Sequence, residues 1–353
     1  MTDPALQTTT ATLKQLKRIV LWTILLSVFT LLICVGWYAY YVITPGPQTL
    51  TETVTVTIPR GTSVRGIAKI LAQKDVIHDD FRFLLLASFS GYSSRLQAGE
   101  FLLQTGRKPG EVLKALASAR SIEYAITIPE GLRAAEIAEI FAEAGWCDPK
   151  TFVDLSYDKS VMEKLGFANL ASLEGYLYPD TYLFTKDIRS AEKIIPIMVK
   201  RFTDVWQELS AGLDTEVDQE KTVILASIVE KETGAPEERP LIAGVFHNRM
   251  KYGMRLQSDP TVVYGSKNFS VPITRKDLKT PTPYNTYTLP GLPVGPISNP
   301  GKDALEAVLH PATTKNIYFV SKNNGTHHFS TTLREHNRAV QKYQRKKKVK
   351  KGK

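Results

Sequence analysis

The most uniform stretch of the chain is an apolar run from residue 19 to residue 43, which contains no charged residue. It is as long as the roughly 20 residues that a helix needs to cross a bilayer. Aromatic side chains gather at its far end, as they do at membrane interfaces: Trp37, Tyr38, Tyr40 and Tyr41. Basic residues flank its start, so the positive-inside rule predicts a cytoplasmic segment 1–18, a transmembrane helix 19–43 and an outer remainder.

A cleaved signal peptide is the alternative interpretation of this run. The apolar region of a signal peptide is shorter and leads to small residues at the cleavage site. Here the run ends in the bulky residues Tyr40, Tyr41, Val42 and Ile43, which favours an uncleaved anchor.

Two later segments share a strand–turn–helix pattern. Residues 51–58 alternate like a strand and lead into Pro59-Arg60-Gly61, after which apolar residues recur at helical spacing from Val64 to Leu71. Residues 124–128 lead into Pro129-Glu130-Gly131 in the same way, with helical spacing over 134–141. We expect both copies to belong to compact α+β units, the first over 50–122 and the second within 123–215.

Other local patterns add a strand near 97–103 and a short helix over 110–119. The stretch from Glu174 to Tyr182 is rich in aromatic residues beside Glu174 and Asp180. Such a composition suits a sugar-binding surface and a core loop equally well. From residue 221 onward, helical segments are followed by a loop region rich in Pro, Gly, Asn, Thr and Tyr, where binding and catalytic residues often concentrate.

The segment 221–234 carries the strongest chemical signal. It reads as a helix that ends at Gly234 as its C′ residue. On a helical projection Glu232 continues the apolar face of Ile228, whereas Glu230 lies nearly opposite. Partial burial and the C-terminal end of the helix dipole both raise the pKa of a carboxyl at this position. Such a carboxyl suits the general acid of glycosidic cleavage. The alternative is that both glutamates cap a solvated helix end.

Composition and charge limit the function classes. The 353 residues are 43% hydrophobic and 23% charged, as expected for folded domains. Of the net charge of +10, eight positive charges lie in residues 342–353, leaving +2 for the rest. The basic tail, predicted over 341–353, is either a solvated disordered segment or a binder of acidic polymers or lipids, and the predicted topology argues against nucleic acid. The two cysteines, Cys34 and Cys147, cannot pair in a folded monomer, and no spacing suits a metal site.

Several motifs in order resemble the MltG (YceG-like) endolytic murein transglycosylases. They comprise residues 226–233 (ASIVEKET), 245–250 (VFHNRM), 253–262 (GMRLQSDPTV), 280–287 (TPTPYNTY), 291–297 (GLPVGPI) and His310-Pro311. The resemblance covers nearly the whole chain, including the anchor and both Ile-Pro-x-Gly turns. One departure is Ser258, where the family commonly has threonine; the hydroxyl is kept.

The resemblance implies an α+β fold with a LysM-like subdomain over 50–122 and a lysozyme-like catalytic domain over 216–340. It implies Glu232 as the catalytic residue, acting without cofactor or metal. The implied reaction is lyase-type cleavage between N-acetylmuramic acid and N-acetylglucosamine within glycan strands, which leaves 1,6-anhydro ends and terminates growing strands. The implied place is the inner membrane of a bacterium, with the catalytic domain periplasmic and peptidoglycan synthases or penicillin-binding proteins as partners.

Further site residues follow from chemistry and position. Hydroxyl, amide and aromatic side chains suit saccharide subsites, and we expect substrate contacts from Gln257, Ser258, Asp259, Tyr284, Asn285 and Tyr287. Accessory roles are expected for Glu230, Glu174 and Asp180. Two alternatives stay open at this point: a non-catalytic peptidoglycan-binding scaffold of the wall-synthesis machinery, and a true hydrolase acting on the same strands.

Overall fold

The computed structural model describes residues 4–48, 51–118, 121–213, 217–266, 269 and 271–344. From residue 345 on, the predicted basic tail lies outside the described residues, as do the first three residues of the predicted cytoplasmic segment. The chain mixes helices with two-stranded antiparallel sheets. It divides into two compact units: unit 1 is Met1–Glu123 with Thr185–Asp187, and unit 2 is Tyr124–Phe184 with Ile188–Lys353. The predicted module 123–215 and the predicted catalytic region 216–340 thus fall largely in one unit.

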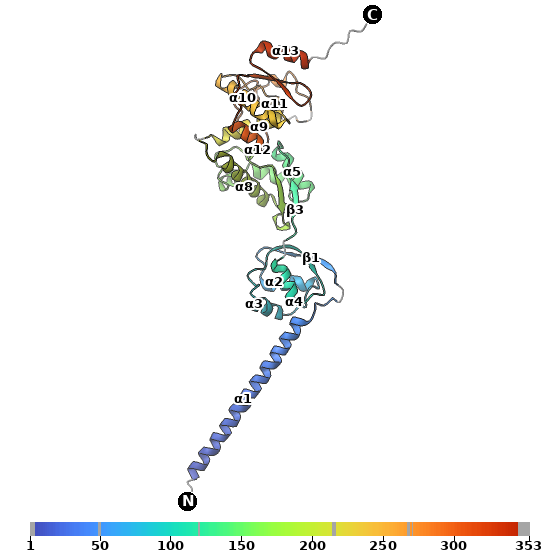
Figure 1. Ribbon diagram of the computed structural model, residues 1–353, viewed down its shortest axis with the longest axis vertical. Helices are drawn as coiled ribbons and strands as arrows, with labels where there is room; N and C mark the ends of the chain where they lie inside the picture. The colour runs from blue at the N-terminus through green and yellow to red at the C-terminus, as the bar shows by residue number, and fades with distance from the viewer. Residues whose placement is uncertain are drawn as a thin grey trace. The chain divides into compact units, whose positions relative to one another are not determined.

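Unit 1 begins with the apolar helix. Helix α1 spans Pro4–Ile43, and its portion Leu16–Ile43 is 28 residues long, with a mean hydropathy of 2.6 and an exposed surface. This helix is long and apolar enough to cross a membrane, which suggests a membrane anchor; Tyr41 in its last turn is the exception to the exposure, because it is 2% exposed and packs in unit 1. Figure 1 shows α3 and α4 at the end of α1 that joins the rest of unit 1.

The remainder of unit 1 is a two-stranded sheet covered by helices. Its elements are β1 (Thr53–Ile58), α2 (Val64–Gln73), α3 (Arg82–Phe89), β2 (Gly99–Gln104) and α4 (Pro109–Ser118). Strand β1 pairs antiparallel with β2, from Thr53 opposite Gln104 to Ile58 opposite Gly99. Ser63 caps α2 by accepting a hydrogen bond from the Gly66 backbone N–H at 3.2 Å. The strand and helix predicted around Pro59-Arg60-Gly61 are therefore present.

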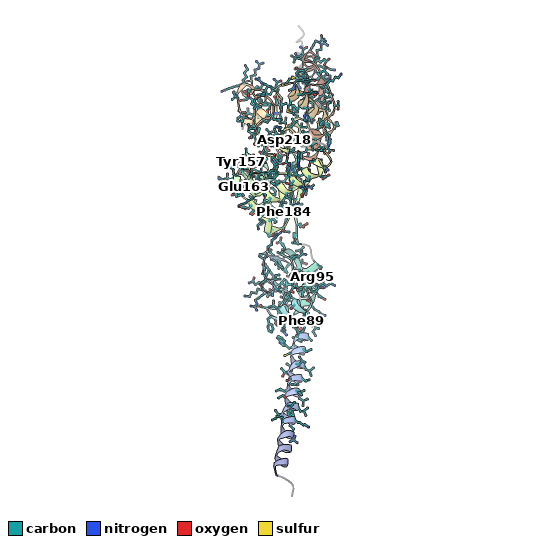
Figure 2. All side chains as sticks on the ribbon, turned by 90° about the vertical axis from the view of Figure 1, so that its left-hand side faces the viewer. Phe89, Arg95, Tyr157, Glu163, Phe184 and Asp218 are labelled. Carbon is teal, nitrogen blue, oxygen red and sulfur yellow. The ribbon has the colours of Figure 1, made fainter. Side chains whose placement is uncertain are left out.

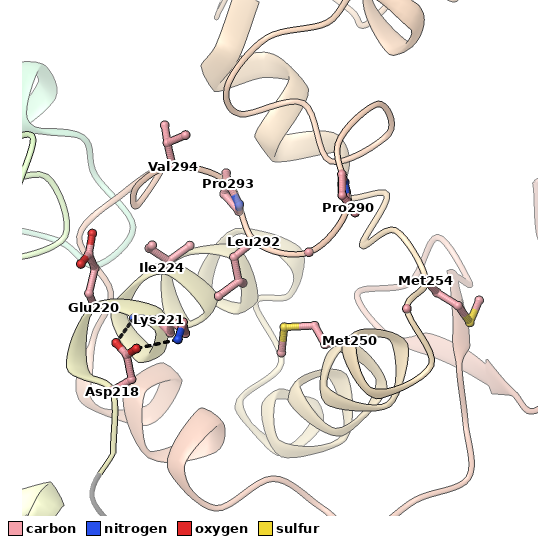
Figure 3. Close-up of a pocket in the computed structure, with 12 residues that line it drawn as sticks. Asp218, Glu220, Lys221, Ile224, Met250, Met254, Pro290, Leu292, Pro293 and Val294 are labelled. Atoms are coloured by element: carbon pink, nitrogen blue, oxygen red, sulfur yellow. Dashed lines mark hydrogen bonds and ion pairs between the residues drawn. The ribbon is translucent and has the colours of Figure 1, made fainter.

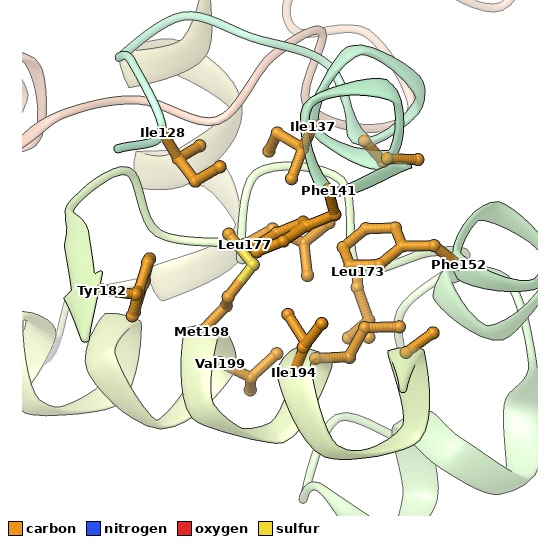
Figure 4. Close-up of a cluster of buried hydrophobic side chains, with 14 of the residues drawn as sticks. Ile128, Ile137, Phe141, Phe152, Leu173, Leu177, Tyr182, Ile194, Met198 and Val199 are labelled. Atoms are coloured by element: carbon orange, nitrogen blue, oxygen red, sulfur yellow. The ribbon is translucent and has the colours of Figure 1, made fainter. Parts of the chain in front are cut away.

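Unit 2 contains two hydrophobic cores. The first is built by β3 (Tyr124–Thr127), α5 (Ala134–Glu143), α6 (Pro149–Ser156), α7 (Lys159–Lys164), β4 (Thr181–Phe184) and α8 (Ala191–Ser210). Figure 4 shows Phe141 and Phe152 packed above Ile194 and Met198 of α8. The aromatic stretch after Glu174 belongs to these cores: Tyr176, Tyr178 and Tyr182 are 1%, 6% and 7% exposed. It is a core loop, which settles the ambiguity of its composition.

The second core surrounds helix α9 (Gln219–Glu232). Its other elements are α10 (Arg239–Lys251), α11 (Asp259–Ser266), α12 (Lys302–Leu309), β5 (Tyr318–Ser321), β6 (His327–Ser330) and α13 (Leu333–Tyr343). Asp218 caps α9 by accepting a hydrogen bond from the Lys221 backbone N–H at 3.0 Å. Helices α10, α11 and α12 lie around α9 (Figure 1), and every residue from Thr222 to Val229 is buried. The helix is therefore central to unit 2 rather than amphipathic, which corrects the projection with a single buried face.

The end of α9 also differs from its prediction. The helix stops at Glu232 because Thr233 adopts an extended backbone, with φ −142° and ψ 138°. The Thr233 hydroxyl accepts a hydrogen bond from the Ala235 backbone N–H at 3.0 Å. Gly234 is not among the glycines with positive φ, so the expected left-handed C′ residue is wrong. The extended Thr233 ends the helix directly after Glu232.

Candidate active site

Glu232 lies at the last position of α9 and lines a cavity of about 570 Å³. The opposite wall comes from the β5–β6 hairpin and from α13, including Tyr318, His327 and His336. The loop that enters α11 supplies Gln257 and Asp259, and Tyr287 comes from the following loop. The cavity therefore brings together three of the predicted substrate-contact residues and the predicted catalytic carboxyl.

The environment of Glu232 favours a protonated carboxyl. The pKa of Glu232 is raised to about 7, chiefly by burial and also by the nearby negative charge of Asp259. Two neighbours act in the other direction: the hydrogen bond from Ser258 and the positive charge of Arg249 lower this pKa. Burial is the largest of these causes, so a substantial fraction of the carboxyl keeps its proton at neutral pH.

Ser258 holds the Glu232 carboxyl in place from behind the cavity. Its hydroxyl donates a hydrogen bond to Oε1 of Glu232 at 2.5 Å, and its side chain does not line the cavity. Ser258 is 1% exposed, and its backbone N–H donates to the Thr286 hydroxyl at 2.9 Å. The loops that contain Ser258 and Thr286 thereby fix Oε1 of Glu232.

Asp259 and Tyr287 form a hydrogen-bonded pair in the wall of the cavity. The Tyr287 hydroxyl donates to Oδ1 of Asp259 at 2.6 Å. Burial and this hydrogen bond raise the pKa of Tyr287, so its phenol keeps its proton. Gln257 precedes them with φ 51°, a left-handed backbone that a non-glycine residue adopts at a cost of about 1 kcal/mol. Its backbone N–H donates to the Thr286 carbonyl at 3.2 Å, which helps to hold this conformation.

Arg249 lines the same cavity, although sequence reasoning gave it no role. It lies on α10, is 6% exposed, and donates to the Ile317 carbonyl at 2.7 Å and to the Leu256 carbonyl at 2.5 Å. Burial lowers the pKa of Arg249. The guanidinium joins the start of β5 to the loop before Gln257. The motif Phe246-His-Asn-Arg-Met contained this residue, but its buried position depends on segments distant in the sequence.

Glu230 is buried, contrary to the prediction that it lies on the face away from the core. Its carboxyl accepts from the Arg239 guanidinium at 2.9 Å and from the Gly301 backbone N–H at 3.0 Å. Its side chain is 6% exposed and that of Arg239 is 8% exposed. Arg239 also pairs with Asp303 at 3.1 Å. These contacts tie the end of α9 to the starts of α10 and α12, which is a positioning role.

The second Ile-Pro-x-Gly turn packs against the same end of α9. Gly131 has φ 75°, and its backbone N–H donates to the Asn299 carbonyl at 2.9 Å. The Lys231 ammonium donates to the Gly131 carbonyl at 3.0 Å. An added Cβ at Gly131 would lie 3.4 Å from the Glu230 side chain. That contact is an ordinary van der Waals distance, so it is the positive φ that favours glycine at this position.

Two further cavities are linked to the Glu232 cavity by shared lining residues. The second cavity, of about 370 Å³, is lined by Asp259, Lys231 and Arg133 among others. The third cavity, of about 290 Å³, shares Arg133 with the second and includes Tyr284 and Glu174. Tyr284 is therefore placed away from Glu232, with its ring 4.6 Å from that of Tyr264. Asp259 lines both the Glu232 cavity and the second cavity.

Glu174 lies at the inner wall of the third cavity and is 3% exposed. Its Oε1 accepts from the Ala134 backbone N–H and from the Asn299 amide, both at 2.9 Å, and its Oε2 accepts from the Tyr264 hydroxyl at 3.1 Å. Burial raises the pKa of Glu174 to about 7. The carboxyl links α5, α11 and the loop before α12.

Two other predicted residues lie outside all three cavities. Asn285 is 1% exposed, and its side-chain amide donates to the carbonyls of Asp277 at 3.0 Å and Thr280 at 2.7 Å. Its side-chain oxygen accepts from the Tyr287 backbone N–H at 2.9 Å. Asp180 pairs with Arg201 at 2.6 Å. The Asn285 side chain is thus used to shape the loop that presents Tyr287.

A separate cavity of about 560 Å³ lies at the other end of α9 (Figure 3). Its lining is largely apolar, with Ile224, Met250 and Leu292, and Asp218 pairs with Lys221 at its edge at 2.8 Å. No residue predicted for the site lines this cavity. Its carboxyls, Asp218 and Glu220, belong to the first turn of α9, far along the helix from Glu232.

Comparison with known proteins gives a consistent result. The model of the YceG-like family matches residues 56–342. An endolytic murein transglycosylase of Bacillus subtilis (strain 168) is 35% identical over 321 residues, covering 87% of this chain and 89% of the relative. One of Streptococcus pneumoniae (strain D39) is 30% identical over 81% of this chain and 58% of the relative. The crystal structure of a yceG-like protein from Listeria monocytogenes has a TM-score of 0.55 and 33% identity, covering 82% of this chain and all of that one.

Proposed function

This chain belongs to the YceG-like family, and we propose that it is a membrane-anchored endolytic transglycosylase of peptidoglycan. Its substrate is the β-1,4 bond from N-acetylmuramic acid to N-acetylglucosamine within glycan strands. The observation that carries the proposal is Glu232, a carboxyl with a pKa of about 7 in the wall of an open cavity. The names of the related transglycosylases supply the substrate class.

The proposed reaction needs one carboxyl that first gives a proton and then takes one. Protonated Glu232 transfers its proton to the glycosidic oxygen as the bond from C1 of the muramic residue breaks. The resulting carboxylate accepts the proton of the C6 hydroxyl of that residue as its oxygen bonds to C1. The products are a 1,6-anhydro end and a free 4-hydroxyl, and no water is consumed. The pKa near neutrality suits both steps.

The neighbours of Glu232 have roles that fit this reaction. We propose that Ser258 orients Oε1, so that the proton resides on Oε2, which faces the sugar. Asp259 and Tyr287 are proposed to contact the sugar on either side of the broken bond, and the negative charge of Asp259 helps Glu232 to hold its proton. Gln257 is proposed as a further hydrogen-bonding contact in the same cavity.

Cleavage within strands requires space for glycan on both sides of the bond. The shared residue Asp259 joins the Glu232 cavity to the second cavity, and Arg133 joins the second cavity to the third. We propose that the strand follows this series, with Tyr284 contacting a sugar remote from the cleaved bond. Glu230, Glu174 and Asp180 are proposed to support the site through the contacts described above.

The remaining expectations are proposals about the whole molecule. We propose that α1 anchors the chain in the inner membrane of a bacterium with its N-terminus cytoplasmic, so that unit 2 is periplasmic. Residues 50–122 of unit 1 are proposed to be the LysM-like subdomain, and residues 216–340 of unit 2 the lysozyme-like domain, that the resemblance implies. Peptidoglycan synthases or penicillin-binding proteins are the proposed partners, and termination of growing strands is the proposed outcome.

Product analysis tests the proposed reaction. Purified peptidoglycan is digested with the full-length protein in detergent, beside Glu232→Gln, and the glycan ends are analysed by mass spectrometry. We expect 1,6-anhydro ends on products of many lengths from the wild type and none from the variant. Reducing ends would indicate a hydrolase. An inactive wild type, together with a Glu232→Gln protein that keeps its full biological effect, would favour a non-catalytic scaffold.

A further inference from the structure

An apolar face of α3 points away from the core of unit 1. Phe81, the N-cap residue, is 61% exposed, and Phe89, the last residue of the helix, is 77% exposed. Leu85, midway between them, is part-exposed. The spacing of four residues places all three on one side of a helix. The side chains of Phe83 and Ala87 face the core instead and are fully buried. The exposed face is thus distinct from the packing face.

This face is continuous with the aromatic end of α1. The Phe81 ring lies 5.4 Å from the ring of Trp37, and the Phe89 ring lies 6.1 Å from that of Tyr38. Figure 2 labels Phe89 beside the end of α1. Trp37 and Tyr38 belong to the aromatic cluster that is typical of a membrane interface. Phe81, at the N-cap of α3, and Phe89, at its end, therefore extend the aromatic cluster of α1 onto unit 1.

The contact between α1 and α3 is fixed by polar bonds as well as by rings. The Arg82 guanidinium donates to the Trp37 carbonyl at 2.9 Å, lies 4.3 Å from the centre of the Trp37 ring, and pairs with Asp80 at 2.5 Å. Tyr41, in the last turn of α1, is 2% exposed and belongs to the core of unit 1. The end of α1 is thus built into unit 1, so α3 stays at the level of the belt.

We propose that Phe81, Leu85 and Phe89 form a membrane-contacting face, which inserts into the headgroup boundary of the outer leaflet beside α1. The inference rests on α1 spanning the membrane. Large apolar side chains at this level are stabilised by the boundary between headgroups and acyl chains. In water the same residues would be an exposed apolar patch, which soluble surfaces seldom keep without an interaction partner. Unit 1 then lies directly on the membrane without an intervening spacer.

Site-directed fluorescence in vesicles tests this contact. The full-length protein, with Cys34 and Cys147 replaced by alanine, receives one cysteine at Phe81, Phe89, Leu26 or Leu102 and is labelled with bimane. Each protein is placed in phosphatidylcholine and phosphatidylglycerol vesicles whose acyl chains carry bromine, a contact quencher. Leu26, 66% exposed on α1, reports the span, and Leu102, 60% exposed on β2, is the matched control in unit 1.

The inference predicts loss of roughly half or more of the emission at positions 81 and 89, stronger with bromine near the headgroups than with bromine deep in the chains. Position 26 should be quenched most by deep bromine, and position 102 should be quenched little. If position 26 is quenched while 81 and 89 behave like 102, the membrane-contacting face is wrong although the anchor stands. If position 26 is not quenched, α1 does not span the membrane, and the proposed membrane-contacting face is wrong as well. Neither result bears on the chemistry of Glu232.

Discussion

The Ser258 hydroxyl donates a hydrogen bond to the Glu232 carboxyl at 2.5 Å from a position that is itself closed to solvent. The bond couples the end of α9 to the loop that leads into α11. It stabilises the charged form of the carboxyl, whereas burial and Asp259 stabilise the neutral form. Glu232 is therefore held near the balance between its two forms, which is what a group that must both give and take a proton requires.

Removing the Ser258 hydroxyl should raise the pH at which kcat/KM begins to fall. The pKa of Glu232 rises in Ser258→Ala because the hydrogen bond that lowers it is lost. Wild-type kcat/KM should fall about tenfold per pH unit above pH of about 7, because only protonated Glu232 starts the reaction. In Ser258→Ala this fall should begin at higher pH. Initial rates of glycan release measured across pH check it, and Ser258→Thr, which keeps a hydroxyl, is the control.

Neutralising Asp259 should lower the pH at which kcat/KM begins to fall. The negative charge of Asp259 raises the pKa of Glu232, so Asp259→Asn lowers that pKa, and activity should decline from a lower pH. The amide keeps an acceptor for the Tyr287 hydroxyl, which preserves the local geometry. If kcat/KM declines at the same pH in Asp259→Asn, in Ser258→Ala and in the wild type, Glu232 is not the group whose titration limits activity.

Substitutions of the two glutamates at the end of α9 should affect different properties: one stability and the other activity. Glu230→Gln removes a charge that faces buried Arg239, and we expect a loss of about 3 kcal/mol in the free energy of unfolding. Such a protein should keep activity where it is folded. Glu232→Gln should lose activity with its fold intact. Chemical unfolding of the full-length proteins in detergent measures stability, and the digestion assay measures activity. An active Glu232→Gln protein, or a stable but inactive Glu230→Gln protein, would contradict the assignment of Glu232 as catalytic and Glu230 as structural.

Glu232 should also make stability depend on pH. Its pKa is about 7 in the folded protein against 4.5 for the free side chain, so between these values the folded state holds a proton that the unfolded chain has lost. Stability contributed by this proton is complete below about 4.5 and falls as pH rises through about 7. Glu232→Gln should therefore exceed the wild type by about 3 kcal/mol at high pH and match it at low pH. Equal stability at both pH values would contradict the raised pKa.

Glu174 should prove structural rather than catalytic. Glu174→Ala leaves the Ala134 N–H and the Asn299 amide without their acceptor, which we expect to cost about 3 kcal/mol. Glu174→Gln keeps the carbonyl oxygen for these donors and offers its amide to the Tyr264 hydroxyl, so it should remain folded and active. Thermal unfolding and strand cleavage of both variants check this. Loss of activity in a well-folded Glu174→Gln would give the carboxyl a direct role.

Local signals in the sequence were sufficient for the elements that carry the site. The helical spacing of apolar residues in segment 221–234 predicts α9, and the structure places the helix over Gln219–Glu232. The alternation before Pro59 and Pro129 predicts β1 and β3, and the helical spacing after each turn predicts α2 and α5. These elements depend on period and on nearby turn residues, which are visible within a short window.

Contacts between distant segments could not be predicted in this way. The burial of Glu230 depends on Arg239 and on the Gly301 backbone, and the far wall of the Glu232 cavity comes from Tyr318 and from α13. Arg249 had a place in a motif but no visible role, because its partners are the carbonyls of Leu256 and Ile317. A helical projection assumes one solvent face, whereas α9 is surrounded by its neighbours.

The most direct test of the account is a titration of the Glu232 carboxyl itself. Full-length protein labelled with ¹³C at the glutamate carboxyls is followed by NMR as pH changes, and Glu232→Gln identifies the signal by its loss. The account predicts a midpoint at pH of about 7. A midpoint near 4.5, the value of a free glutamate side chain, would contradict it, because the carboxyl would then have no proton to give at neutral pH.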